Sequence, residues 1–157
     1  MNELTLSVDP GLHGLGCGLW RGKELVAGWY AGPVAGGRGP ARWRQVVEAG
    51  LMPLAGVEVG RLVVEVMQIY PHMKGDPDDV LEVQGVAGTL AGWRVWKAEG
   101  VTARAWKGQV PQAIMAARIE HQLAARGWTD RLDPACPARR RHDMLHGVGV
   151  GVFALGA

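Results

Sequence analysis

The strongest constraint on the fold is an apolar run near the N-terminus that ends at an acid. Residues 4–8 are apolar or β-branched and predict a buried strand, which Asp9 follows directly. Pro10 cannot continue a central strand, and Gly11 permits a turn with positive φ. Residues 15–20, which are rich in glycine, predict a returning strand. A carboxylate is therefore expected where a buried strand meets a sharp turn. Such an acid is often only a turn former, so Asp9 needs partners to indicate chemistry.

Length and composition favour one globular domain over residues 1–157. The chain is 48% hydrophobic and 20% charged, which is typical of a protein with a sizeable core. Cys17 and Cys136 fit neither a disulfide framework nor a zinc motif, so two reduced thiols are expected. No stretch reaches the roughly 18 apolar residues of a membrane helix, and residues 1–3 do not resemble a signal peptide. We expect an intracellular protein with no membrane partner.

Charge is spread unevenly along the chain. Residues 1–101 hold 9 Lys/Arg and 11 Asp/Glu, a net −2, whereas residues 102–157 hold 8 and 4, a net +4. The basic second part favours a polyanionic partner. Random drift of surface charge would explain the same numbers equally well.

The hydrophobic patterns predict the element order βββαβαβα. After the first two strands we expect a strand at 23–30, a helix at 41–55, a strand at 61–66, a helix at 77–99, a strand at 101–105, a loop at 106–111, a helix at 112–126 and a last helix at 139–155. Three strands joined by hairpins, followed by two reached through helices, imply an α/β fold. Its sheet would be mixed and five-stranded, with helices on both faces.

Two features within these elements need a partner. Glu65 is the one acid inside the aliphatic strand at 61–66. A buried, unpaired carboxylate costs several kcal/mol, so Glu65 requires a cation, a metal or a raised pKa, and a pairing arginine is the ordinary explanation. Gly85, Gly88 and Gly92 each lower helix propensity by about 1 kcal/mol. Close packing must compensate, against a helix of the same chain or of a second copy.

Further candidate ligands lie in the last helix. Asp143 and His146 are three residues apart and so share a helix face. With Asp9 and Glu65 they form a set of oxygen and imidazole donors drawn from separate elements. A two-metal phosphodiesterase needs such convergence, because its Mg²⁺ ions lie about 3.5–4 Å apart.

The chain resembles the RuvC-like Holliday junction resolvases of the ribonuclease H-like superfamily, particularly short phage-type members, over most of its length. The resemblance rests on four segments: Val8-Asp9-Pro10-Gly11 with the glycine-rich strand after it, Val63-Val64-Glu65, Trp106-Lys107-Gly108 before Pro111, and Asp143-Met144-Leu145-His146-Gly147. It implies a ribonuclease H-like fold with Asp9, Glu65 and Asp143 as catalytic metal ligands.

The resemblance leaves the fourth active-site position open. His146 stands where an aspartate is more usual, and imidazole binds Mn²⁺ more readily than Mg²⁺. Mn²⁺ is therefore expected to support activity beside Mg²⁺. His146 could instead position or deprotonate the attacking water. His142 competes for the same position.

The implied reaction is paired hydrolysis of phosphodiesters in a four-way DNA junction, leaving 5′-phosphate and 3′-hydroxyl ends. Resolvases of this family act as two-fold homodimers, and the helix carrying the three glycines matches the family's dimer element. The implied location is the cytoplasm of a bacterium or of a phage-infected host.

Basic and aromatic residues are the expected DNA contacts, with Lys107 as the first choice. Trp106, expected in a loop, could stack on a base, and Tyr70 is the aromatic nearest to the family's junction wedge. The remaining candidates are Lys74, Arg104, Arg118, Arg139, Arg140 and Arg141, with Arg38 as a weaker choice. Gln112 stands where relatives often have a lysine.

Three alternatives stay open. Another ribonuclease H-like nuclease, acting on RNA–DNA hybrids or on flaps, would use the same acids. An actin or sugar-kinase type of nucleotide-binding domain also begins with a strand, an Asp-x-Gly turn and a hairpin, but it repeats the fold twice and needs more than 157 residues. A binding module without catalysis could retain the fold.

Overall fold

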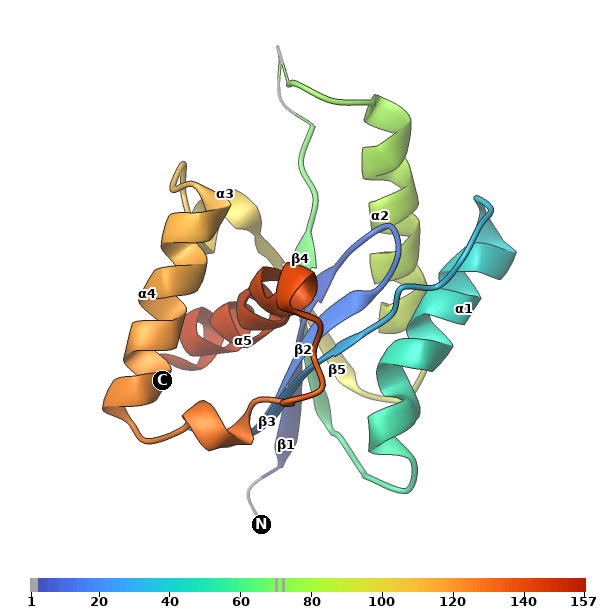
Figure 1. Ribbon diagram of the computed structural model, residues 1–157. Coiled ribbons are helices and arrows are strands. Elements are labelled where there is room, and N and C mark those ends of the chain that lie inside the picture. Colours follow the sequence, from blue (N-terminus) through green and yellow to red (C-terminus); the bar gives the residue numbers. More distant parts are fainter. Residues whose placement is uncertain (1–2, 70, 72) are drawn as a thin grey trace.

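The computed structural model describes residues 3–69, 71 and 73–157. One sheet carries five strands in the order β3-β2-β1-β4-β5 (Figure 1). The strands β1–β2 and β2–β3 pair antiparallel, whereas β1–β4 and β4–β5 pair parallel. Their bounds are β1 Leu4–Pro10, β2 Leu15–Arg21, β3 Glu24–Ala31, β4 Arg61–Val66 and β5 Lys97–Thr102. The predicted mixed sheet is confirmed.

Helices cover both faces of this sheet, as expected. Figure 1 shows α1 and α2 on one face, with α4 and α5 on the other. Two separate clusters of buried apolar side chains match these two layers. The helices are α1 Pro40–Leu51, α2 Pro77–Ala91, α3 Ala103–Trp106, α4 Gln112–Ala125 and α5 Arg141–Leu155, with 3₁₀ turns at Met52–Leu54, Thr129–Arg131 and Ala138–Arg140.

Strand β1 is buried on both sides. Its Leu6 and Val8 join the cluster under α1 and α2. Ser7 faces α5, donates a hydrogen bond to the Gly147 carbonyl at 2.7 Å and accepts one from the Trp20 indole at 2.8 Å. The buried Ser7 hydroxyl is thereby satisfied and fastens α5 to the sheet.

Glycine allows α5 to lie directly on β2. A Cβ on Gly147 would overlap the backbone of Gly16, and a Cβ on Gly16 would overlap the Asp143 carbonyl. The glycines that the sequence places in the second strand therefore serve close approach of a helix. This contact brings Asp143 to the same end of the sheet as Asp9.

Four predicted boundaries are wrong. Strand β1 continues through Pro10, which pairs with Leu15 of β2, and helix α1 ends at Leu51 rather than residue 55. Helix α2 ends at Ala91 rather than residue 99, with Gly92 as its C-cap. Strand β5 occupies Lys97–Thr102 rather than 101–105, and Ala103–Trp106 form the short helix α3. The strand was missed because it lies at the sheet edge with Val101 as its buried side chain, so no apolar alternation marks it.

The helix α2 begins as predicted. Asp76 caps it by accepting a hydrogen bond from the Asp78 amide, and Pro77 is its first residue. Within it, Gly85 lies against the Trp43 ring of α1, which a Cβ would overlap. That glycine serves packing inside the chain. Gly88 is exposed with open space before it, so contact with a second copy there stays a prediction.

Two smaller expectations concern thiols and membranes. Both Cys17 and Cys136 are free, and burial raises the pKa of the Cys17 thiol. None of the helices in the described part of the chain combines the length and apolar character that crossing a membrane requires.

Candidate active site

Asp9 is the last residue but one of β1 and lies beside the turn that the sequence predicts. The Gly11 amide donates to the Gly14 carbonyl at 2.9 Å and closes that turn. The side chain of Asp9 keeps 16% of its surface exposed, and its Oδ2 lies 3.6 Å from Nδ1 of His146. It therefore has access to solvent and an imidazole beside it.

Glu65 lies near Asp9 because β4 runs parallel to β1 and pairs with it. Its carboxylate is buried, and its partners come from α3 and the residue that follows it. The Trp106 indole donates to Oε2 at 2.6 Å, and Nζ of Lys107 lies 3.2 Å from Oε2 and 3.4 Å from Oε1. The cation that the buried acid requires is thus a lysine, in place of the arginine considered from the sequence.

The surroundings of Glu65 oppose its charge. Burial raises the pKa of the Glu65 carboxyl above its ordinary value, and the Asp9 carboxylate raises it further. Lys107 and the Trp106 hydrogen bond lower it without cancelling the rise. Two acids that repel each other beside one lysine form a place where added positive charge is favoured.

Glu65→Gln should therefore stabilise the protein near neutral pH in a chelating buffer. A carboxyl whose pKa is raised by folding stabilises below its unfolded-state pKa, and that stability is lost as pH rises through the folded-state pKa. Glutamine imitates the protonated form and avoids the loss. Thermal unfolding should show a higher Tm for the variant at pH 7, with the difference shrinking at pH 4. The compared quantity is the Tm of the variant minus the Tm of wild type. If this difference is smaller at pH 7 than at pH 4, this view of Glu65 is contradicted.

Asp143, in the first turn of α5, has an arginine and a histidine beside it. Arg140 Nη1 lies 3.3 Å from its Oδ2, and His142 Nε2 lies 3.1 Å from its Oδ1. The Arg140 guanidinium also covers the Tyr30 ring, 5.6 Å from the centroid. Its Nε is buried without a hydrogen-bond partner among the described residues. Arg140 thus holds an acid and retains an unused donor.

His146 and His142 approach different acids. His146 is fully buried, and its Nε2 lies 3.2 Å from the Gln112 carbonyl. A carbonyl only accepts, so Nε2 carries the proton, and in the neutral ring the lone pair of Nδ1 faces Asp9. His142 is half exposed and lies at Asp143. The structure therefore puts His146, and not His142, beside the acid of β1.

These side chains border one cavity of about 470 Å³ at the carboxyl ends of β1 and β4. Three acids from β1, β4 and α5 line it, together with two cations. The residues that matter here are Asp9, Glu65, Asp143, Lys107, Arg140 and Tyr30. His146 lies behind Asp9 rather than in the cavity wall.

The acids do not form a finished metal site. Among residues 3–69, 71 and 73–157, no three Asp, Glu, His or Cys side chains are grouped so that they could hold an ion. Lys107 and Arg140 instead hold two of the three carboxylates. Carboxylate oxygens are nevertheless the donors that Mg²⁺ and Mn²⁺ prefer. The donor set fits a divalent cation in kind, provided that these ion pairs open.

The structure sorts the predicted DNA contacts into three groups. Lys107 and Arg140 lie in the cavity, whereas Arg141 pairs with Glu120 of α4. Four others are exposed: Lys74, Arg104, Arg118 and Arg139. Arg38 pairs with Asp79. Tyr70 lies outside the described residues.

The position expected for Trp106 is wrong. It closes helix α3 instead of standing in a loop, because Thr102 caps that helix by accepting a hydrogen bond from the Ala105 amide. Its ring meets that of His146 edge to face, with centroids 5.7 Å apart, and its indole holds Glu65. Stacking of Trp106 on a base stays a prediction. In the structure its indole N–H holds the Glu65 carboxylate.

Sequence reasoning missed His13, Tyr30 and the Asp143 contact of Arg140. The last could have been found, since residues three apart share a helix face. Tyr30 and His13 reach the cavity from β3 and from the first turn, and no local pattern marks either.

The strand order and the two helical layers define a ribonuclease H-like α/β fold. Solved structures with this fold include Thermus thermophilus RuvC in complex with a Holliday junction substrate, with a TM-score of 0.61 and 16% identity over 98% of this chain and 93% of that one. A second Thermus thermophilus RuvC structure gives a TM-score of 0.60 and 15% identity over 97% and 93%. No family model and no curated protein matches the sequence. The RuvC likeness expected from the sequence is confirmed for the fold.

Proposed function

We propose that the protein is a metal-dependent endonuclease that resolves four-way DNA junctions. The observation that carries the proposal is the convergence of Asp9, Glu65 and Asp143 on one cavity, from β1, β4 and α5. The RuvC fold supports it, and one of the structures with that fold is described as bound to a Holliday junction substrate.

The three carboxylates would hold two Mg²⁺ ions, and Mn²⁺ would support activity as well. Nδ1 of His146, which faces Asp9, would be the fourth donor, while the Gln112 carbonyl engages its other nitrogen. Ligating histidines are commonly oriented in this way. When bound, the ions would activate water and stabilise the leaving oxygen.

The remaining residues of the cavity would handle the phosphate. Lys107 and Arg140, released from Glu65 and Asp143, are the two cations able to contact its oxygens. The buried Nε of Arg140 supplies a further donor. Trp106 would keep Glu65 in place through its indole N–H after Lys107 has moved.

Lys107→Ala is expected to weaken junction binding and to lower the slope of log affinity against log salt by about one unit, because one phosphate contact is lost. Lys97→Ala is the matched control, since Lys97 is exposed at the opposite end of β5. Binding titrations at four salt concentrations measure both. An unchanged slope for Lys107→Ala would show that this lysine does not contact phosphate.

We also propose that the protein acts as a homodimer whose two copies meet through α2. Its proposed location is the cytoplasm. The exposed side of α2 carries Leu81 and Gly88, where a second helix could approach closely. Sedimentation at micromolar concentration is expected to show a dimer. A monomer that resolves junctions under the same conditions would overturn this part.

The test of substrate class is a binding panel in EDTA. Four-way junctions, linear duplex, flaps and RNA–DNA hybrids of equal length are compared. We expect at least ten-fold tighter binding to the four-way junction than to the linear duplex. Equal or tighter binding to hybrids or flaps would favour another ribonuclease H-like nuclease.

A further inference from the structure

The turn between β1 and β2 presents a histidine at the rim of the acidic cavity. His13 is exposed, and its carbonyl accepts a hydrogen bond from the Val34 amide at 2.7 Å. The Gly11–Gly14 hydrogen bond closes the turn from inside. The histidine thus projects from backbone that is held on two sides.

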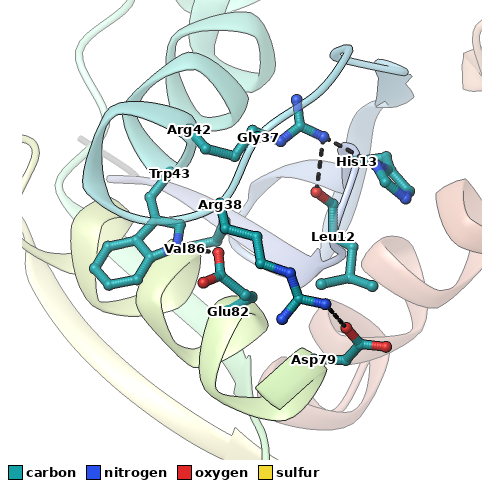
Figure 2. A pocket seen from close by; sticks show the side chains of 9 residues that line it. All are labelled: Leu12, His13, Gly37, Arg38, Arg42, Trp43, Asp79, Glu82 and Val86. Atoms are coloured by element: carbon teal, nitrogen blue, oxygen red, sulfur yellow. Dashed lines mark hydrogen bonds and ion pairs between the residues drawn. The ribbon is translucent and has the colours of Figure 1, made fainter. Parts of the chain in front are cut away.

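A buried arginine fixes the ring. Arg42 of α1 keeps only 5% of its surface exposed. It donates to the carbonyl of Leu12 at 3.0 Å and to Nδ1 of His13 at 2.9 Å (Figure 2). It also donates to the Ala35 carbonyl at 3.1 Å. No carboxylate in the described part of the chain forms an ion pair with it. Its positive charge is therefore directed at the turn.

This contact determines where the imidazole proton lies. A guanidinium has donors and no acceptor, so Nδ1 of His13 must accept. The ring is then neutral, and its proton is on Nε2. That nitrogen has no hydrogen-bond partner among the described residues. An N–H polarised by a nearby arginine is a good donor to an anion.

His13 stands between two cavities. It lines the acidic cavity and also a second one of about 270 Å³, whose charged lining residues are Arg38, Arg42, Asp79 and Glu82 (Figure 2). A chain bound at the acids and continuing towards α1 would cross this residue. If His13 only supported Arg42, it would use Nδ1 alone, and its Nε2 donor would have no role.

We propose that Nε2–H of His13 binds a non-bridging oxygen of a DNA phosphate next to the one at Asp9, Glu65 and Asp143, with Arg42 as the positioning residue. The identity of the anion as a DNA phosphate rests on the proposed function, whereas the donor geometry of His13 rests only on its contact with Arg42.

Two variants separate the two nitrogens of the ring. In His13→Asn the side-chain oxygen can accept from Arg42 in place of Nδ1 but no donor reaches outward. In His13→Gln the amide nitrogen reaches the position of Nε2. Affinity for a four-way junction in EDTA should fall about ten-fold for His13→Asn and be largely retained for His13→Gln. Equal Tm values would show that both variants are folded.

Methylphosphonate substitution, one position at a time, identifies the phosphate. At one position near the cleavage site, the change should weaken wild type about ten-fold and weaken His13→Asn no further. If no position depends on His13 while junctions are bound selectively, the inference fails and the resolvase proposal stands. If His13 dependence occurs on linear duplex as strongly as on junctions, the inference stands and junction selectivity fails. A protein that binds no DNA overturns both.

The tautomer gives a separate check that uses no DNA. Imidazole ¹⁵N spectra of the free protein should show Nδ1 of His13 unprotonated and Nε2 protonated. A proton on Nδ1 would overturn the inference.

Discussion

Asp9→Asn is expected to lower junction cleavage about a thousand-fold or more while leaving junction affinity unchanged. Asparagine keeps the shape of the side chain and removes its charge, so a divalent cation loses one of its oxygen ligands. Metal-ion stabilisation of the transition state is worth several kcal/mol, and each 1.4 kcal/mol changes the rate ten-fold. Asp9 is also the acid beside His146 and the one that opposes the charge of Glu65. Removing the Asp9 charge therefore affects the acid that lies beside two other proposed metal ligands, Glu65 and His146.

Asp130→Asn is the matched control, because it makes the same chemical change on the surface in the 3₁₀ turn Thr129–Arg131. Its cleavage rate should equal that of wild type. Single-turnover rates with a labelled junction measure both variants. Cutting by Asp9→Asn at the wild-type rate would end the metal hypothesis.

Gly147→Ala is expected to produce the largest loss of stability, about 3 kcal/mol or more. The added methyl would overlap the backbone of Gly16, and a backbone cannot move aside as a flexible side chain can. Helix α5 would have to lift from β2, which would break the Ser7 hydrogen bond to the Gly147 carbonyl. Asp143 and His146 would then move away from the cavity, so activity should fall with stability.

Gly88→Ala makes the same change where a Cβ meets nothing within 4 Å. Alanine has the higher helix propensity, and the monomer of this variant, measured at a protein concentration too low for the proposed dimer, should gain about 0.5–1 kcal/mol. Urea unfolding of the two variants tests the comparison. Equal stability of Gly147→Ala and wild type would show that α5 does not depend on this contact.

The sheet and the main acids were predictable because their signals are local. Residues 4–11 contain a strand, its end and its turn, and residues 61–66 contain a buried strand with one acid. The boundary between α2 and β5 was not predictable in the same way. Residues 92–96 continue an apolar pattern after the helix has ended, and β5 is an exposed edge strand held by backbone pairing.

The partners of the acids depend on contacts between distant parts of the chain. Glu65 and Lys107 are 42 positions apart, and His13 and Arg42 are 29 apart. A sequence pattern shows that a buried acid needs a cation, but the fold decides which one reaches it. The spacing of three residues predicted that His146 shares a face of α5 with Asp143, and the distances to Asp9 and Gln112, which the sequence does not show, favour His146 over His142 in our proposal.

Incubation of the wild-type protein with end-labelled four-way junctions, with Mg²⁺, with Mn²⁺ and with EDTA, tests the central claim most directly. The account predicts paired nicks in two opposed strands, leaving 5′-phosphate and 3′-hydroxyl ends, with either metal and none in EDTA. Asp9→Asn, Glu65→Gln and Asp143→Asn should bind the junction and leave it intact. Junctions that bind wild type with full affinity and are not cut with either metal would contradict the claim that this cavity is a nuclease site.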